Sequence, residues 1–302
     1  MLKKLLILLL VVSCSSAIFA QKDYSENWKA AYKLYRARKY AEAMDAFVKL
    51  AESTSNPGYI FNCYIHAGYS ARNLKKYDEA VAFAEKAGKV ENPYQYSSMI
   101  REMDFMYSAR KYKEVIEKFP AETIMKWPAC YRSDALYYLG LSQYNLKQGE
   151  DAEKTFTLMF ENAQHFNHEA LALLRHGYNY RNRIKDADKA FEAYNKIVQT
   201  EGAHPNYHAE AFICLASILI NQKKNDEAIA EYDKLLALKK LSGYWKSRGF
   251  YDKGNLLKKM GKNEEAVKCY NDAIATKGCA SWVKNGCEKQ LKAMEPKAEK
   301  TE

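Results

Sequence analysis

A short motif that ends on a small residue returns at a nearly constant interval along most of this 302-residue chain. Its clearest copy is Lys76-Tyr77-Asp78-Glu79-Ala80, and we call the last residue of each copy the anchor. The anchors are Ala43, Ala80, Val115, Ala152, Ala190, Ala228 and Ala266, with successive spacings of 37, 35, 37, 38, 38 and 38 residues. Self-similarity at one period predicts a solenoid, in which each repeat buries its apolar side against its neighbours.

Each repeat is expected to contain two antiparallel helices. The first helix carries a small residue twelve or thirteen positions before the anchor: Ala31, Gly68, Met103, Gly140, Gly177, Ala216 and Gly254. The second helix carries an apolar residue four positions after the anchor: Phe47, Ala84, Phe119, Phe156, Tyr194, Tyr232 and Tyr270. Helices packed about 8–10 Å apart need small side chains where their backbones approach and bulky ones beside them, so both patterns are typical of helix packing.

The fourth repeat carries the clearest family resemblance. Its stretch from Leu136 to Gly140, followed by Ala152 and Phe156, resembles the tetratricopeptide repeat (TPR), whose pattern is Trp-x2-Leu-Gly-x2-Tyr and then Ala-x3-Phe. The resemblance covers roughly residues 24 to 295. It implies an all-α fold, a right-handed superhelical α-solenoid of about seven TPR-like helix pairs plus a C-terminal capping helix.

Two repeats depart from the pattern. Met103 and Val115 stand in the third repeat where small residues belong, so we expect loose packing or an altered helix angle there. The fifth repeat has one extra residue between Gly177 and Ala190. After the seventh repeat, residues 281–294 are expected to form the capping helix, within a cap at 280–295.

Turn-forming residues fall between the repeats. They are Asn56-Pro57-Gly58, Asn92-Pro93, Trp127-Pro128, Gly202-Ala203-His204-Pro205 and Leu241-Ser242-Gly243. Proline and glycine interrupt helices, and we expect each of these stretches to separate one repeat from the next.

The first twenty residues have the layout of an export signal. Lys3 and Lys4 precede an apolar run and a small-residue stretch that ends at Ala20, which is too short for a membrane span. The Ala20–Gln21 ending resembles signals of Bacteroidota and predicts a mature chain that begins at Gln21. The alternative is a lipobox that leaves lipidated Cys14 at the mature N-terminus. The predicted organisation is thus a signal peptide at 1–20, a TPR solenoid at 21–295 and a disordered charged tail at 296–302. The protein is expected to be exported to the periplasm, and anchoring at the outer membrane is the alternative that a lipidated Cys14 would bring.

The chain contains 24 tyrosines, and many lie on one face of the first helices. Positions three before and one, four and five after the small residue share that face. The predicted partner-binding residues are Tyr32, Tyr35, Arg36, Tyr69, Arg72, Asn73, Tyr107, Tyr137, Tyr144, Asn145, Tyr178, Arg181, Asn182, Asn221, Tyr251, Asn255 and Lys258. Asn can hold a peptide backbone, Arg and Lys can hold carboxylates, and Tyr supplies rigid contact area. The alternative is that these tyrosines only pack between adjacent first helices.

These residues favour a non-enzymatic scaffold or adaptor that binds a protein or an extended peptide in the concave groove of the solenoid. The alternative function is an envelope-biogenesis or transport component that handles outer-membrane proteins or glycan. The net charge of +10 is spread over interleaved acids and bases, which is typical of a solvated surface, and we expect no nucleic-acid partner. No cofactor is implied, because the chain has no phosphate-binding glycine loop and no G-x-S-x-G or HExxH motif.

The cysteines and histidines do not predict a metal site. Six cysteines follow Cys14, and a bridge among Cys269, Cys279 and Cys287 is one open alternative. Cys63 and Cys214 lie in first helices, where buried thiols are expected. The pairs His165/His168 and His204/His208 are expected to lie in a loop and a turn, without ligand spacing for zinc.

Overall fold

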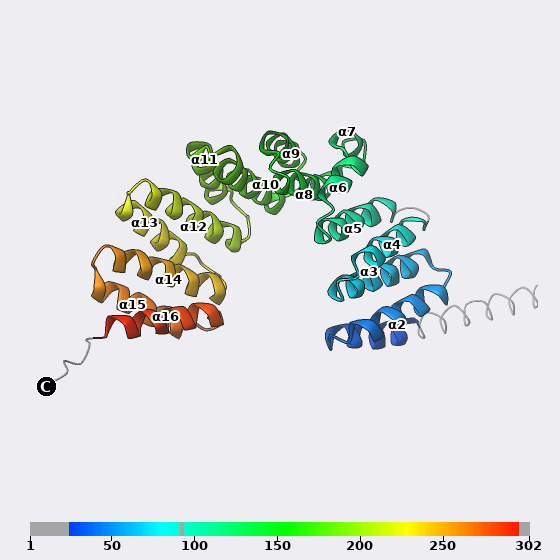
Figure 1. The fold of residues 1–302 in the computed structure, drawn as a ribbon, viewed down its shortest axis with the longest axis horizontal. Helices are drawn as coiled ribbons and strands as arrows, with labels where there is room; N and C mark the ends of the chain where they lie inside the picture. The colour runs from blue at the N-terminus through cyan, green and yellow to red at the C-terminus, as the bar shows by residue number, and fades with distance from the viewer. Residues whose placement is uncertain (1–23, 91–93, 296–302) are drawn as a thin grey trace, which may run out of the picture. The chain divides into compact units, whose positions relative to one another are not determined.

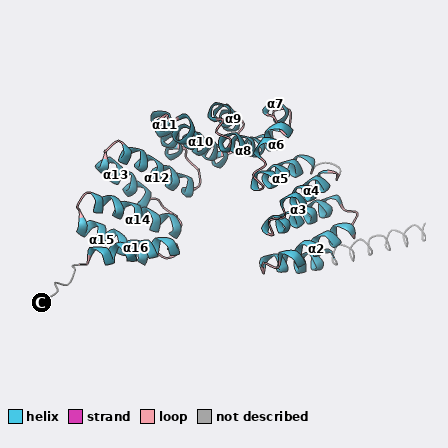
Figure 2. Ribbon diagram, in the orientation of Figure 1, coloured by secondary structure: helices cyan, strands magenta, loops and turns pink. Residues whose placement is uncertain are grey.

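The computed structural model describes residues 24–90 and 94–295. The predicted signal peptide, Cys14, the Asn92-Pro93 turn and the charged tail lie outside the described residues. The described elements are all helical, with no strand among them (Figure 2). The all-α solenoid predicted from the repeats is confirmed. The chain divides into two compact units, Met1–Leu146 and Lys147–Glu302, which we describe separately.

The first unit begins with a helix over residues 24–36 and continues with seven helices in chain order (Figure 1). They are α2 (Tyr40–Glu52), α3 (Pro57–Asn73), α4 (Tyr77–Gly88), α5 (Gln95–Ser108), α6 (Tyr112–Lys118), α7 (Ala121–Ile124) and α8 (Ala129–Asn145). Helices α2 to α6 pack on each other in sequence, α6 and α7 both pack on α8, and α3 also contacts α5, the first helix of the next repeat.

The second unit follows the same plan. It contains α9 (Gly149–Glu161), α10 (Phe166–Asn179), η1 (Tyr180–Ile184), α11 (Ala187–Gln199), α12 (Pro205–Asn221), α13 (Asn225–Leu236), α14 (Gly243–Lys259), α15 (Asn263–Ala275) and α16 (Ser281–Met294). The α16 helix has the bounds expected for the capping helix, and it packs on both α14 and α15.

The anchors lie where the two helices of a repeat approach most closely. All seven anchors are fully buried. A Cβ atom at Gly177 would lie 2.4 Å from the Tyr194 ring, which is too close for any side chain at residue 177. In the second repeat, the residue four after the anchor is Ala84, and the space above Gly68 is filled by Phe105 of α5. The predicted pairing of small and bulky residues is therefore confirmed, although the bulky partner can come from the next repeat.

The turn inside each repeat contains a residue in the left-handed region, always five positions before the anchor. These residues are Arg38, Lys75, Arg110, Lys147, Lys185, Lys223 and Gly261, with φ from 61° to 78°. In the first repeat the next amide, Lys39 N, donates to Leu34 O at 3.0 Å, which satisfies a carbonyl at the end of the first helix. The sequence did not predict this geometry, because basic residues stand at six of the seven positions where glycine is usual.

The third repeat is irregular, but the helix contact in it is tightly packed. Met103 and Val115 are fully buried, so the contact between the two helices is not loose there. Instead, the second helix is short. It ends at Lys118, and the short α7 follows Pro120, which cannot continue a helix because it lacks an amide hydrogen.

The extra residue of the fifth repeat is accommodated in the first helix. The last residues of that helix form the π-helical turn η1, and Lys185 then takes the left-handed conformation. The Asp186 amide donates to Tyr180 O at 2.9 Å and closes the turn. A π turn holds one more residue than an α turn, so the anchor Ala190 still reaches its buried position.

The predicted turns lie at the starts of first helices. Asn56 caps α3, its side chain accepting from Tyr59 N at 3.2 Å. Pro57 and Pro205 occupy the first turns of α3 and α12, where a missing amide hydrogen costs nothing. Trp127-Pro128 and Ser242 likewise precede α8 and α14. The turn predictions within the described residues are confirmed.

Candidate functional site

The residues predicted to bind a partner lie on the first helices, and we call their common surface the first-helix face. None of them is fully buried: Arg36, Asn73 and Asn221 are exposed, and the others are half-buried. Half-burial fits both a binding surface and a surface that packs between adjacent first helices. The contacts of the individual side chains show what each can still offer a ligand.

Two asparagines link neighbouring repeats of the first unit. Asn73 Nδ2 donates to Tyr35 OH at 3.3 Å and to Tyr69 O at 2.8 Å. In the same way, Asn145 Nδ2 donates to Tyr107 OH at 3.1 Å and to a backbone carbonyl one turn earlier. Each amide therefore uses both of its hydrogens inside the unit and can offer a ligand only its oxygen.

Arg72 on this face makes both an ion pair and a contact with an aromatic ring. Its Nη1 lies 2.9 Å from Asp104 Oδ2 on α5, and its guanidinium lies 5.1 Å from the centre of the Tyr69 ring. Burial raises the pKa of Tyr69, and the neighbouring Arg101 lowers it in part. Burial also raises the pKa of Tyr138 on α8 above its ordinary value. Asp104 adds to that rise, and Arg101 opposes it. The first unit thus presents aromatic rings beside paired charges of both signs.

An aromatic cluster around His66 lies at the start of this face. The imidazole is surrounded by Trp28 at 5.4 Å, Tyr32 at 5.9 Å and Tyr69 at 5.9 Å between ring centres. Its Nδ1 donates to Asn62 O at 2.8 Å, and burial lowers the pKa of His66. The sequence analysis did not select His66. A lone histidine within a tyrosine-rich first helix was the only available signal.

The second unit holds its predicted residues through different partners. Tyr178 OH donates to Glu210 Oε1 on α12 at 2.6 Å, and burial raises the pKa of Tyr178 above its ordinary value. Lys258 Nζ donates to Gln290 Oε1 on α16 at 2.9 Å. Tyr270 OH donates to the Asn255 side chain at 3.0 Å. Glu210, another residue that sequence analysis missed, places a carboxylate on this face.

The remaining predicted residues fall into two groups. Aromatic contacts hold Tyr32, which stacks on Trp28 at 5.0 Å, Tyr137, which meets Tyr138 edge-on at 5.2 Å, and Tyr251, which meets Trp282 at 5.8 Å. Tyr144, Arg181 and Asn182 are half-buried. In the first unit, Tyr35 meets Asn73 and Tyr107 meets Asn145, whereas the contacts described for the second unit run to residues outside the predicted set.

Four of the six described cysteines are buried, and His165 and His204 lie at the starts of α10 and α12. The six described cysteines are all thiols, so no bridge joins Cys269, Cys279 or Cys287. Cys63 and Cys214 are buried as expected. His204 precedes α12, as predicted. The predictions for the other two residues are wrong: His208 lies within α12 and not in a turn, and His168 lies in the first turn of α10 and not in a loop.

Neither a metal-ligand cluster nor a membrane-spanning helix is present among the described residues. Within residues 24–90 and 94–295, no three His, Cys, Asp or Glu side chains come together as metal ligands. None of the helices over these ranges has the length and hydropathy that a bilayer crossing requires.

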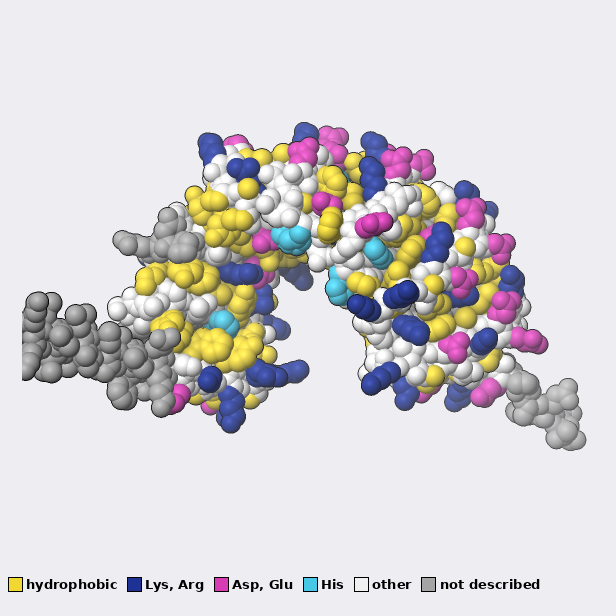
Figure 3. Space-filling view, turned by 180° about the vertical axis from the view of Figure 1, so that it is seen from behind, with side chains coloured by type: hydrophobic (Ala, Val, Ile, Leu, Met, Phe, Trp, Pro, Cys, Tyr) yellow, Lys and Arg dark blue, Asp and Glu magenta, His cyan; other side chains and the backbone are white. Residues whose placement is uncertain are grey.

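Acidic and basic side chains are interspersed over the second unit in the view of Figure 3. Ion pairs between neighbouring second helices show the same mixing, such as Lys111 with Asp78 at 2.7 Å and Lys118 with Glu85 at 3.0 Å. These lysines of the first unit therefore have acidic partners on the neighbouring second helix.

Comparisons with known proteins agree with this architecture. Models described as tetratricopeptide repeat match residues 61–91, 134–160, 171–201, 209–240 and 247–277, which together make up half of the chain. No curated protein matches the sequence.

Several solved structures share the fold. A tetratricopeptide repeat protein from Parabacteroides merdae is 15% identical, with a TM-score of 0.53 over 89% of this chain and 99% of that chain. The C-terminal part of a TPR repeat-containing protein from Cytophaga hutchinsonii is 15% identical, with a TM-score of 0.50 over 86% and 98%. A human IFIT1 dimer with m7Gppp-AAAA is 14% identical, with a TM-score of 0.51 over 89% of this chain and 62% of that one. The buried anchors, the helix pairs and the matching models lead to one conclusion: the chain belongs to the tetratricopeptide repeat family.

Proposed function

We propose that this protein is an exported, non-enzymatic scaffold that binds an extended protein segment along the first-helix face. The observation that carries the proposal is the set of half-buried Tyr, Arg and Asn side chains that neighbouring repeats hold in place. Tyr35 with Asn73 and Arg72 with Asp104 are examples in which one repeat fixes a side chain of the next. Side chains that are already ordered lose little entropy on binding, so such a face is suited to a partner.

The chemistry of the face favours a peptide. Tyrosine rings supply amphipathic area, and the remaining amide oxygens can accept hydrogen bonds from peptide N–H groups. The charges on the face have both signs, because Arg72 lies beside Asp104 and Tyr178 lies beside Glu210. A partner of mixed charge fits this pattern better than a uniformly charged polymer does.

Nucleic acid is the alternative partner, and the experiment described below must distinguish its binding from that of a peptide. The similar human IFIT1 structures contain m7Gppp-AAAA and PPP-AAAA. A surface for RNA needs basic groups that are available to phosphates, whereas many lysines here pair with acids, as in Lys262 with Asp226. We therefore propose a protein partner.

Export belongs to the proposal and rests on the sequence of the first twenty residues. Mass spectrometry of the mature chain distinguishes a start at Gln21 from a lipidated Cys14. An intact Met1 in the cell envelope fraction, or a cytosolic protein, would contradict export.

The test of the face compares two double variants of the full mature chain. Tyr69→Ala with Arg72→Ala changes the face, whereas Lys113→Ala with Glu117→Ala changes exposed residues of α6. Both are screened against a peptide array and against a labelled RNA oligonucleotide. We expect the first variant alone to lose peptide binding while its helical circular dichroism is kept. Equal peptide binding by both folded variants, or binding of RNA only, would refute the proposal.

A further inference from the structure

The basic excess of the chain is concentrated at its C-terminal end. Residues 239–295, which span the seventh repeat and the cap, contain 13 Lys and Arg but only 6 Asp and Glu, a net charge of +7. Residues 23–238, which span the first six repeats, contain 29 of each and are neutral. A concentration of one sign of charge attracts partners of the opposite sign, so this end of the second unit is suited to an acidic partner.

Two lysines of the capping helix α16 are free of ion pairs within the described residues. The only acid in the sequence of α16 is Glu288, which lies 3.9 Å from Lys284, one turn earlier. Lys289 and Lys292 are both exposed, and neither belongs to any ion pair that the described part of the chain forms. Their ammonium groups therefore remain available to a partner.

A tryptophan lies on the same side of α16 as these two lysines. Positions three or four residues apart share one side of a helix, and we call the resulting exposed row the cap stripe: Trp282, Asn285, Lys289 and Lys292. On the other side of the helix, Val283 and Cys287 are fully buried. Trp282 is 48% exposed, although the outer face of a capping helix is ordinarily polar. The cap stripe therefore joins exposed apolar area to two free cations.

The cap stripe adjoins the first-helix face of the seventh repeat. The Trp282 ring meets the ring of Tyr251, on α14, edge-on with 5.8 Å between the ring centres. The two helices approach closely at Gly286, where a Cβ atom would lie 2.9 Å from Tyr251 OH. Lys258 Nζ of α14 donates to Gln290 Oε1 at 2.9 Å and adds a cation at the same boundary. Because Tyr251 and Lys258 belong to the first-helix face, a segment bound to α14 can continue onto the cap stripe.

We propose that the cap stripe binds an acidic stretch of the extended protein segment that occupies the first-helix face. This inference rests on the proposed function, since it assigns a charge to one end of the bound segment. An apolar side chain of the partner lies against Trp282, and its carboxylates lie against Lys289 and Lys292. Along the axis of α16 the two lysines are about 10 and 15 Å from Trp282, so the carboxylates are separated from the apolar residue by about three to five positions of an extended chain.

A protein segment fits this surface better than an anionic membrane does. Binding of a helix at a membrane surface increases with the apolar area that it buries, and Trp282 is the only large apolar side chain of the cap stripe. The capping helix also exposes Glu288, which a flat layer of anionic headgroups would repel. An extended segment can place its carboxylates on the lysines alone.

The experiment follows the indole signals of the four tryptophans by NMR, in the full mature chain labelled with nitrogen-15 tryptophan. Trp282→Phe assigns the signal of the cap stripe. The probes are the blocked peptide Phe-Ser-Ser-Glu-Glu-Glu, its counterpart with Gln in place of Glu, and phosphatidylglycerol vesicles. At low ionic strength the acidic peptide is expected to shift the Trp282 signal saturably, with a dissociation constant on the order of 1 mM. The counterpart should bind at least about fivefold more weakly, because it lacks the charges.

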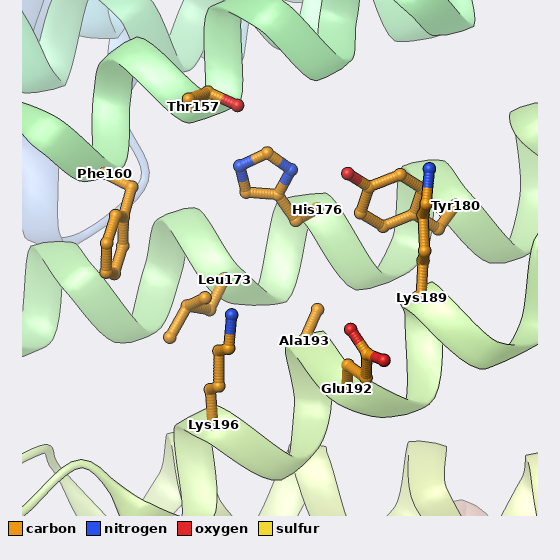
Figure 4. Close-up of a pocket in the computed structure, with 9 residues that line it drawn as sticks. All are labelled: Thr157, Phe160, Leu173, His176, Tyr180, Lys189, Glu192, Ala193 and Lys196. Carbon is orange, nitrogen blue, oxygen red and sulfur yellow. The ribbon is translucent and has the colours of Figure 1, made fainter.

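A matched pair of lysine variants tests the contribution of the cap stripe. Lys289→Gln with Lys292→Gln should weaken binding of the acidic peptide about fivefold. The control, Lys189→Gln with Lys196→Gln, removes the same charge from α11 of the same unit, where the two lysines lie on either side of Glu192 (Figure 4). It should leave the affinity unchanged within about twofold, since exposed charges away from the site are screened.

No saturable shift with the acidic peptide, equal binding of the two peptides, equal losses in the two double variants, or binding of the vesicles alone would overturn the inference. The result is distinguishable from that for the first-helix face. If Tyr69→Ala with Arg72→Ala loses binding to the peptide array but the Trp282 signal does not respond to the acidic peptide, only the inference about the cap stripe fails. If the Trp282 signal responds but that double variant binds the array as the wild-type protein does, the proposed function fails instead.

Discussion

The second and fifth repeats fill the same hollow in different ways. Both have a glycine where the two helices of the repeat approach, Gly68 and Gly177, and in both an aromatic ring covers that glycine. Over Gly177 the ring is Tyr194 of the same repeat, whereas over Gly68 it is Phe105 of the next repeat. The origin of the ring determines whether the contact holds one repeat together or joins two repeats.

The two units differ in a related way along the first-helix face. In the first unit, an asparagine of one repeat binds the tyrosine of the preceding repeat, as in Asn73 with Tyr35. In the second unit the residue that corresponds to Tyr35 before Asn221 is Arg181, which has no acceptor atom for the asparagine amide. Links between repeats there run through Tyr178 with Glu210 and Lys258 with Gln290. The same fold therefore allows different polar links between neighbouring repeats.

The largest expected loss of stability comes from removing the two rings that cover Gly68 and Gly177. Phe105→Ala and Tyr194→Ala should each lower the free energy of unfolding by about 3–5 kcal/mol, since each ring is fully buried. Chemical denaturation measures both values. Hydrogen exchange then separates them: Phe105→Ala should loosen α3 and α5 together, whereas Tyr194→Ala should loosen α10 and α11.

A second substitution sharpens that test. Gly68→Ala alone should cost about 1–3 kcal/mol, because the new Cβ would lie 2.6 Å from the Phe105 ring. In the Phe105→Ala background the same change should cost much less. Additive effects of the two changes would show that Phe105 does not define the hollow.

A pH effect is expected from a buried carboxyl of the second unit. Burial raises the pKa of Asp252 to about 6, although Arg248, with its Nε 3.5 Å from Asp252 Oδ2, opposes the rise. A carboxyl with a raised pKa favours the folded state when it is protonated. The contribution is therefore complete below the ordinary pKa of an aspartic acid, 3.8, and is lost as the pH rises through about 6.

The Asp252→Asn variant isolates this contribution. Relative to the variant, the wild-type protein should lose about 2 kcal/mol of unfolding free energy between pH 4 and pH 7. Denaturation curves at several pH values provide the comparison, and Asp226→Asn, on an exposed carboxylate, is the control. A constant difference between wild type and Asp252→Asn across this range would disprove the assignment.

How far the sequence predicts this molecule depends on the range of the interactions. The repeat register, the anchors and the capping helix follow from the spacing of small and bulky residues, because helix packing repeats with the sequence. The source of the ring over Gly68 could not be predicted, since Ala84 left open which neighbour fills the space. The left-handed Lys75 and the π turn at residues 180–184 were also missed, because backbone conformation there is set by the helix contacts that follow it.

The candidate site was predicted as a face but not as a set of contacts. Sequence spacing placed Tyr69, Arg72 and Asn73 together, yet it could not show that Asp104 neutralises the arginine or that Tyr35 takes an amide hydrogen.

A smaller effect tests the asparagine links. Asn73→Ala and Asn145→Ala should each lower the free energy of unfolding by about 1 kcal/mol, because each removes two hydrogen bonds that are partly open to water. Asn221→Ala, at the equivalent position in the second unit, should change it by less than about 0.5 kcal/mol, because Arg181 stands there in place of the accepting tyrosine. Thermal and chemical denaturation give the three values. Equal effects at all three positions would contradict the difference between the units.

The smallest expected effect concerns the turns that both units share. Lys75→Gly in the first unit and Lys223→Gly in the second should each stabilise the protein by about 0.5 kcal/mol. A left-handed residue with a side chain costs about 1–2 kcal/mol, and the greater freedom of glycine in the unfolded chain offsets part of the gain. Gly261 is the natural control, since it already has φ of 78° and no atom lies near its missing Cβ. Gly261→Lys should therefore destabilise the protein by a similar amount, measured by denaturation. If Lys75→Gly and Lys223→Gly both destabilise it instead, the lysines must stabilise the turns through their side chains, in the two units alike.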